Sequence, residues 1–298
     1  MKALVTGSEG FVGSHLMELL EKQGHQVFGF DLKDGEDLRS YEQVRSAIDY
    51  FRPDKIFHLG AIAYVPESFL DPRRAIETNT MGSLNVLEAV RNLGLKTKIH
   101  LCGTSEEYGD VEGTDVHTTE LSLPNPQSPY SIGKLGMDYL GILYGNAYNM
   151  DVVVTRTFNH TGPGRGEMYA ESAWAKQIVE IEKGSRTVLW HGDLTPVRNY
   201  TDVRDIVEAY TIAIDLPKGV YNICSDRNVT MEDVLEILKG YSKVDIPTEV
   251  DKTLIRPADF SFKAPSSEKF RNLTGWVPKI GLEQTLRDLL DDWRAKLA

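Results

Sequence analysis

The stretch KALVTGSEGFVG, residues 2–13, decides how the first part of this chain folds. Residues 2–6 form an apolar run with the length of a buried strand. Three glycines follow at a spacing of three residues, and an apolar stripe with helical spacing comes next. A glycine turn between a strand and a helix lets backbone N–H groups approach a pyrophosphate. The stretch therefore predicts a dinucleotide site formed by Gly7, Gly10, Phe11, Val12 and Gly13.

A second apolar run, residues 26–30, ends at Asp31, eighteen residues after Gly13. In dinucleotide-binding folds, an acidic residue at about this distance accepts hydrogen bonds from the adenosine ribose. Its carboxylate would repel a 2′-phosphate, so we predict NAD as the cofactor. Lys33 is close enough to keep NADP as an alternative. The competing interpretation is a plain strand–helix–strand unit with a glycine turn.

Strands and helices continue to alternate after this unit. We expect strands at residues 55–58, 98–102 and 152–155, and helices at residues 41–51, 74–93 and 130–148. Such alternation predicts an α/β fold with a Rossmann-type, doubly wound parallel sheet. Ligands bind at the carboxyl ends of the strands in these sheets. We therefore assign to the cofactor site the residues that follow the strand at 55–58, which are Leu59, Gly60 and Ala61.

The pattern becomes irregular from about residue 161. Helices are expected at residues 172–183, 203–216, 231–238 and 282–297, and strands near 187–190 and 220–224. We predict an NAD-binding domain over residues 1–160 and a smaller, mostly C-terminal α/β substrate domain over residues 161–298. Part of the segment 190–225 is expected to rejoin the main sheet, so that the two domains are interleaved in sequence.

Composition excludes several classes of function. The chain of 298 residues carries 33 Lys and Arg against 44 Asp and Glu, a formal net charge of −11, which argues against nucleic-acid and anionic-membrane partners. Two cysteines give neither a disulfide framework nor a thiolate zinc site, and the seven histidines show no ligand spacing, so we predict no metal. No leader pattern and no apolar run of about 18 residues is present, and a cytoplasmic protein is expected.

Tyr130 and Lys134 are spaced to lie on one face of a helix. Pro129 before them suits the first position of a helix, where a missing N–H costs nothing. A lysine ammonium beside a phenol is expected to lower the pKa of the tyrosine, which could then move a proton to or from a substrate oxygen. By itself the pair is also compatible with a packing tyrosine and a surface lysine on an ordinary amphipathic helix.

Taken in order, these motifs resemble the extended short-chain dehydrogenase/reductase family over essentially the whole chain. The resemblance rests on the glycine turn, the Tyr130/Lys134 pair and three segments, HLGA at 58–61, NTMG at 79–82 and TSE at 104–106. Within that family the sequence is most similar to the GDP-mannose branch, which holds 4,6-dehydratases and GDP-4-keto-6-deoxymannose reductases. The signatures of that branch are TFNHTGP at 157–163, RGE at 165–167, KQI at 176–178, TDVRD at 201–205 and RPAD at 256–259.

The resemblance implies a catalytic set of Thr104, Glu106, Tyr130 and Lys134. Thr104 and Tyr130 would bind the sugar O4, Lys134 would hold the nicotinamide ribose, and Glu106 matches the general base of the dehydratases. If the chain is extended there, alternation would place Thr104 and Glu106 on the same side. The residues implied in substrate binding are Asn159, Arg165, Lys176, Arg198, Arg256 and Asp259. Arginine forks suit a diphosphate, although ordinary surface ion pairs are the competing interpretation.

The activity implied is that of a nucleotide-sugar 4,6-dehydratase acting on GDP-mannose. Such an enzyme oxidises C4 on bound NAD(P), eliminates water across C5–C6 and returns the hydride to C6. The alternatives are a GDP-4-keto-6-deoxymannose reductase or an NDP-sugar 4-epimerase that uses the same triad, and, more distantly, a non-catalytic NAD-binding protein. The resemblance also suggests a homodimer through the helices at 74–93 and 130–148; the competing interpretation is that their outer faces are solvated.

Overall fold

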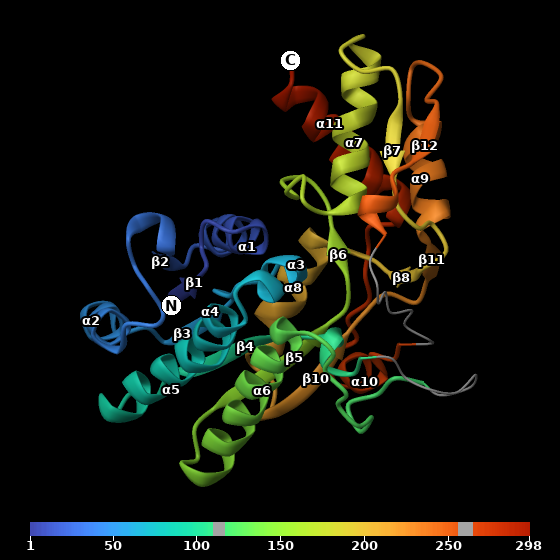
Figure 1. Ribbon diagram of the computed structural model, residues 1–298. Helices are drawn as coiled ribbons and strands as arrows, with labels where there is room; N and C mark the ends of the chain where they lie inside the picture. Colours follow the sequence, from blue (N-terminus) through green and yellow to red (C-terminus); the bar gives the residue numbers. More distant parts are fainter. Residues whose placement is uncertain (110–116, 256–264) are drawn as a thin grey trace.

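The computed structural model describes residues 1–109, 117–255 and 265–298. Its centre is a six-stranded sheet whose paired neighbours are all parallel, in the order β10-β5-β4-β3-β1-β2 (Figure 1). The strands are β1 Lys2–Thr6, β2 Gln26–Phe30, β3 Lys55–His58, β4 Lys98–Thr104, β5 Val152–Thr157 and β10 Gly219–Ile223. The predicted α/β fold with a doubly wound parallel sheet is confirmed.

Helices cover both faces of this sheet because its strands are apolar on both sides. Leu4 points into one core, together with residues of α2, α5 and α6, while Val5 points into the other, with α1, α8 and α10. These helices are α1 Phe11–Lys22, α2 Tyr41–Phe51, α5 Gly82–Asn92, α6 Pro129–Ala147, α8 Val203–Ala213 and α10 Glu268–Thr274. Among the described residues, no helix combines the length and apolar composition that a membrane span needs.

A smaller body packs beside the carboxyl ends of the strands, at the upper right of Figure 1. Three helices, α7 Ala170–Glu182, α9 Met231–Gly240 and α11 Leu282–Lys296, share its core. Its short strands pair as β7 Leu189–His191 with β12 Thr248–Val250, and as β8 Val197–Asn199 with β11 Asn228–Thr230. Between the two bodies, β6 His160–Thr161 pairs with β9 Thr201–Asp202. The division at residue 160 stays a prediction. Two elements that follow α7 in sequence lie with the central sheet: β10 is one of its strands, and α8 packs on one of its faces.

The helix expected at 74–93 is not a single α-helix. The chain forms α4 Pro72–Ile76, one π-helical turn over Glu77–Met81 and then α5. Within that turn the Asn79 side chain exchanges two hydrogen bonds with the backbone of Ile62, at 2.9 and 3.1 Å. Another short helix, α3 Val65–Leu70, and 3-10 turns at Leu32–Asp34, Ser105–Glu107 and Lys252–Leu254 complete the described structure. The π turn thus ties the helix to the loop that follows β3.

Candidate active site

The turn between β1 and α1 has the geometry of a dinucleotide cradle. Gly7 has a φ of +69°, and a Cβ added to it would lie 2.8 Å from the Cα of Gly60. A Cβ on Gly13 would lie 2.0 Å from the Gly7 carbonyl oxygen, so only glycine fits there. Gly10 precedes the first turn of α1, and no side chain of the described residues caps that turn. The first N–H groups of α1 therefore remain available for a pyrophosphate.

The loop after β3 reaches the same cradle. The Gly60 N–H donates to the Thr6 hydroxyl at 3.1 Å, and the same hydroxyl is hydrogen-bonded to His58 at 2.8 Å. Burial lowers the pKa of His58 to about 3, with the Lys134 charge adding to the effect, so the imidazole is neutral. The structure thus places Leu59 and Gly60 against the glycine turn, and the assignment of Leu59, Gly60 and Ala61 to the cofactor site stays a prediction.

Asp31 follows β2 directly and is nearly buried, with 9% of its surface exposed. One carboxylate oxygen accepts the Glu9 N–H at 2.9 Å and the other accepts the Lys33 N–H at 3.0 Å. Lys33 itself donates to the Glu9 carbonyl oxygen at 2.8 Å. The carboxylate therefore fixes the far end of the cradle, and its role in binding the adenosine ribose stays a prediction.

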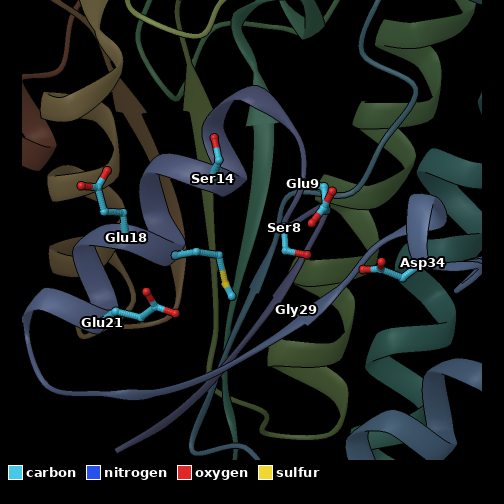
Figure 2. A pocket seen from close by; sticks show the side chains of 8 residues that line it. Ser8, Glu9, Ser14, Glu18, Glu21, Gly29 and Asp34 are labelled. Atoms are coloured by element: carbon cyan, nitrogen blue, oxygen red, sulfur yellow. The ribbon is translucent and has the colours of Figure 1, made fainter.

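An open hollow of about 510 Å³ lies beside this end of the cradle. Figure 2 shows Glu9 and Asp34 on one side of it and Glu18 and Glu21 on the other. Close to the hollow, the pKa of Glu36 is raised, first by burial and then by the charges of Asp34 and Asp31. The surroundings of Asp31 are therefore acidic.

The catalytic candidates meet at the carboxyl end of β4. Thr104 ends that strand, and its hydroxyl accepts the Glu106 N–H at 3.3 Å. Residues 105–107 form a 3-10 turn rather than the extended segment expected from alternation. The correction has a local cause, because Thr104 and Glu107 form a capping box that closes the turn. The turn still brings Glu106 close enough for its charge to act on the Tyr130 phenol.

Tyr130 and Lys134 lie in the first turns of α6. Ser128 caps that helix by accepting the Ser131 N–H at 3.0 Å, and Pro129 occupies its first turn. The ammonium of Lys134 is buried and donates to the Cys102 carbonyl oxygen at 2.7 Å. Burial lowers the pKa of Lys134. The helical prediction for this pair is confirmed.

The prediction of a low pKa for Tyr130 is wrong for the protein without a bound cofactor. Burial raises the pKa of Tyr130 well above its usual value, and the charge of Glu106 raises it further. The hydroxyl of Thr104 opposes this rise as a hydrogen-bond partner. The Lys134 ammonium is directed instead at the Cys102 carbonyl oxygen, 2.7 Å away. The phenol is therefore protonated and suited to donating a hydrogen bond or a proton.

A cluster of buried charged side chains contacts the backbone of Thr104. Glu107 is fully buried and accepts the Thr104 N–H at 2.9 Å. Arg156 lies 3.1 Å from Glu107 and 2.6 Å from Asp138 on α6, and its guanidinium stacks over Tyr108 at 4.9 Å. Burial, followed by repulsion from Asp138, raises the pKa of Glu107 despite the opposing charge of Arg156. Glu107 thus fixes the backbone of Thr104, and its raised pKa favours the protonated carboxylic acid.

Glu107→Gln is expected to become more stable relative to wild type as the pH rises. A raised pKa in the folded state means that the stabilisation by protonated Glu107 is complete below its ordinary pKa and is lost as the pH climbs through the folded value. Glutamine keeps the shape of the neutral acid and does not titrate. Thermal unfolding of both proteins between about pH 5.5 and 8 measures the difference. A stability difference that stays constant over this pH range would show that Glu107 is ionised in the folded protein.

The described residues that are predicted to bind substrate follow β5 or belong to the smaller body. Asn159 follows β5, and its buried side-chain oxygen has no hydrogen-bond partner within the described ranges. Arg165 and Arg198 both approach the half-buried Tyr200, whose pKa their charges lower against a larger rise from burial and Glu171. Lys176 instead pairs with Glu167 and Glu180, so its role in binding substrate stays a prediction. The two remaining substrate candidates lie outside the described residues; they are Arg256 and Asp259.

Two tyrosines near this site did not emerge from the sequence. The rings of Tyr64 and Tyr169 pack edge to face at 5.7 Å, and the charge of Glu106 acts on the Tyr169 phenol. They come from the starts of α3 and α7, which are distant in the chain. No motif marks either residue, because their contact depends on how the two bodies pack. Among the described residues, no group of His, Cys, Asp or Glu side chains is placed to hold a metal.

Comparison with known proteins agrees with this geometry. A family model described as GDP-mannose 4,6 dehydratase matches residues 34–289. The GDP-6-deoxy-D-mannose reductase of Pseudomonas aeruginosa is 29% identical over 299 residues, covering 99% of this chain and 98% of that protein. The solved structure of RMD from Pseudomonas aeruginosa complexed with NADPH superposes with a TM-score of 0.91 at 30% identity, covering 99% of both chains. The solved structure of the UDP-glucose 4-epimerase of Thermus thermophilus in complex with NAD superposes with a TM-score of 0.87 at 30% identity, covering 99% of both chains.

The parallel sheet, the glycine cradle and the Thr104–Tyr130–Lys134 constellation together define an extended short-chain dehydrogenase/reductase, a class that uses NAD or NADP. Within this class, the chain belongs to the GDP-mannose 4,6 dehydratase family.

Proposed function

We propose that this protein is a nucleotide-sugar 4,6-dehydratase that converts GDP-mannose to GDP-4-keto-6-deoxymannose. The observation that carries the proposal is the carboxylate of Glu106, which lies in the turn capped by Thr104 and acts on the Tyr130 phenol. A dehydratase needs a base at this place, whereas reduction of a ketone requires only the proton donor. Incubation with GDP-mannose without added cofactor, followed by mass spectrometry, tests the proposal through the loss of one water.

The described residues divide the reaction between them. Thr104 and Tyr130 would hydrogen-bond the sugar O4, and Tyr130 exchanges the proton of that oxygen as it becomes a ketone. The ketone acidifies the neighbouring C5–H, and Glu106 removes that proton as the C6 hydroxyl leaves. Bound NAD(P) supplies the hydride acceptor at C4 and the donor at C6. Lys134, which is buried below Tyr130, would hold the nicotinamide ribose.

The diphosphate is assigned to the arginine side of the site. Arg165 and Arg198 supply positive charge to an otherwise acidic chain. Arginine is suited to diphosphate oxygens because its planar fork can donate two parallel hydrogen bonds. This arrangement supports a nucleoside diphosphate sugar as substrate, and family membership favours guanine as its base.

A GDP-4-keto-6-deoxymannose reductase is the second candidate. Two observations favour it: the reductase relative aligns over almost its whole length, and Tyr130 is held protonated, as a proton donor to O4 must be. Such an enzyme would consume one NAD(P)H per product and leave GDP-mannose unchanged. The mass-spectrometric test therefore separates the two candidates.

We further propose that NAD is preferred over NADP. A 2′-phosphate on a ribose held by Asp31 would lie among the charges of Asp31, Glu9 and Asp34, while Lys33 is bound to the Glu9 carbonyl. We expect NAD(H) to bind about tenfold more tightly than NADP(H), equivalent to roughly 1.4 kcal/mol. Titration calorimetry with both cofactors measures the ratio. Asp31→Asn should reduce the preference for NAD(H), whereas Glu21→Gln, a change on the opposite side of the hollow, should leave it unchanged. Tighter binding of NADP(H) than of NAD(H) by wild type would contradict the proposal.

A homodimer is proposed through the outer faces of α4, the π turn and α6. Exposed apolar side chains follow α6 at helical spacing, with Ile132 at 48%, Tyr139 at 54% and Leu143 at 52% exposure, and Ile76 and Met81 lie on the neighbouring helix. Because α6 contacts both α4 and the π turn, two copies could close this face as a four-helix bundle.

Light scattering should therefore give about twice the chain mass of 33.4 kDa. Leu143→Glu places a charge in the proposed interface and is expected to yield monomers. Tyr50→Glu, which alters an exposed apolar residue on α2, is the control and should remain dimeric. A monomeric wild type at micromolar concentration would contradict the proposed interface.

A further inference from the structure

The loop over residues 160–169 is attached to the first turn of α1 at three points. The His15 ring nitrogen Nε2 donates to the Pro163 carbonyl oxygen at 2.8 Å. The rings of Phe11 and His160 are parallel, with centroids 6.2 Å apart and an interplanar angle of 6°. The Arg165 guanidinium lies over the Phe11 ring at 4.9 Å. Phe11 opens α1 beside the glycine turn, so these contacts join the loop to the cofactor cradle.

The same guanidinium also lies over Tyr169. The Arg165 carbon Cζ is 3.3 Å from the centre of the Tyr169 ring, and Tyr169 is the residue before α7. The Ser172 hydroxyl, in the first turn of α7, donates to the Arg165 carbonyl oxygen at 2.7 Å. Arg165 therefore contacts both an aromatic residue beside the glycine turn and one that precedes the first helix of the smaller body.

Ion pairing alone does not hold this guanidinium in place. Its nearest carboxylate oxygen, on Glu171, is 3.5 Å from Nε, and within the described ranges this Nε has no hydrogen-bond partner although it is buried. The two rings therefore contribute directly to the position of Arg165. Cation–π contacts of this kind are attractive, and the attraction grows as they are desolvated.

We propose that Arg165 is a positioning residue that couples occupancy of the cofactor site to affinity at the nucleotide-sugar site. Cofactor bound at the glycine turn fixes Phe11, Phe11 fixes Arg165, and Arg165 fixes Tyr169 and the start of α7. The second ligand then meets a site that is already ordered, which raises its affinity. The inference rests on the proposed function, because it takes a nucleoside diphosphate as the second ligand.

Titration calorimetry of GDP with and without saturating NAD⁺ tests the coupling. For wild type we expect GDP to bind at least about fivefold more tightly with NAD⁺ present, the lower end of typical couplings. Arg165→Met should bring the ratio of the two dissociation constants close to one. Phe11→Leu, a second variant that removes only one ring of the stack, should lower the ratio in the same direction. Arg287→Met removes a guanidinium that covers Tyr241 instead and should leave the ratio unchanged.

The pattern of the constants separates positioning from direct contact. If Arg165 only binds the diphosphate, Arg165→Met weakens the binding of GDP by the same factor with and without NAD⁺. The ratio of the two dissociation constants then stays at the wild-type value, which overturns the inference. A wild-type ratio of one also overturns it. If UDP binds and GDP does not, the guanine assignment fails while the coupling is still measured with UDP. If neither nucleotide binds to the NAD⁺-loaded wild type, both the function and the coupling are wrong.

Discussion

Tyr130→Phe is expected to fold like wild type and to lose turnover by a factor of about 10²–10⁴, the usual contribution of a positioned acid or base. The substitution removes one hydroxyl and leaves the ring in place on α6. The lost hydroxyl is the group that shares the site with Thr104 and Glu106. Steady-state turnover of GDP-mannose, with circular dichroism to confirm folding, measures the effect.

The matched control is Tyr139→Phe, the same change on an exposed residue of the same helix. It should retain wild-type turnover, because its hydroxyl lies away from Thr104 and the cofactor cradle. Wild-type turnover in folded Tyr130→Phe would rule out the proposed constellation and leave the family fold without its expected chemistry.

Glu106→Gln is expected to stop dehydration while C4 oxidation continues. Glutamine keeps the shape and a hydrogen-bonding head but cannot accept the C5 proton. We expect product formation to fall about 10²–10⁴-fold and reduced cofactor to accumulate on the enzyme, where its near-ultraviolet absorbance reports it. Glu107→Gln is the control; the glutamine oxygen can still accept the Thr104 N–H, so turnover should change little. Equal turnover in Glu106→Gln and wild type would remove Glu106 from the mechanism.

The sequence predicted the parts of this protein that depend on local patterns. The glycine turn, Asp31 after β2, and Tyr130 one helical turn before Lys134 are each set by neighbours in the chain. Short-range geometry determines where such residues lie once the alternation of strands and helices is recognised. The pattern therefore indicated both the parallel sheet and the cofactor cradle.

The features that escaped prediction depend on contacts between distant segments. Arg165 meets Phe11 only because the smaller body packs beside α1, and Arg156 meets Glu107 only across neighbouring strands. The pKa of Tyr130 was predicted in the wrong direction for the same reason. The spacing placed Lys134 near the phenol, but burial and the charge of Glu106 have the largest effects on the pKa of Tyr130.

The central claim is dehydration, and the fate of the C5 hydrogen tests it most directly. We would incubate the protein with GDP-mannose in D₂O without added NAD(P)H and examine the product by NMR. A dehydratase places deuterium at C5, because that carbon is reprotonated after elimination, and forms GDP-4-keto-6-deoxymannose without consuming external reductant. Unchanged GDP-mannose, together with reduction of a 4-keto-6-deoxy sugar nucleotide at one NAD(P)H per product, would contradict the claim and establish the reductase.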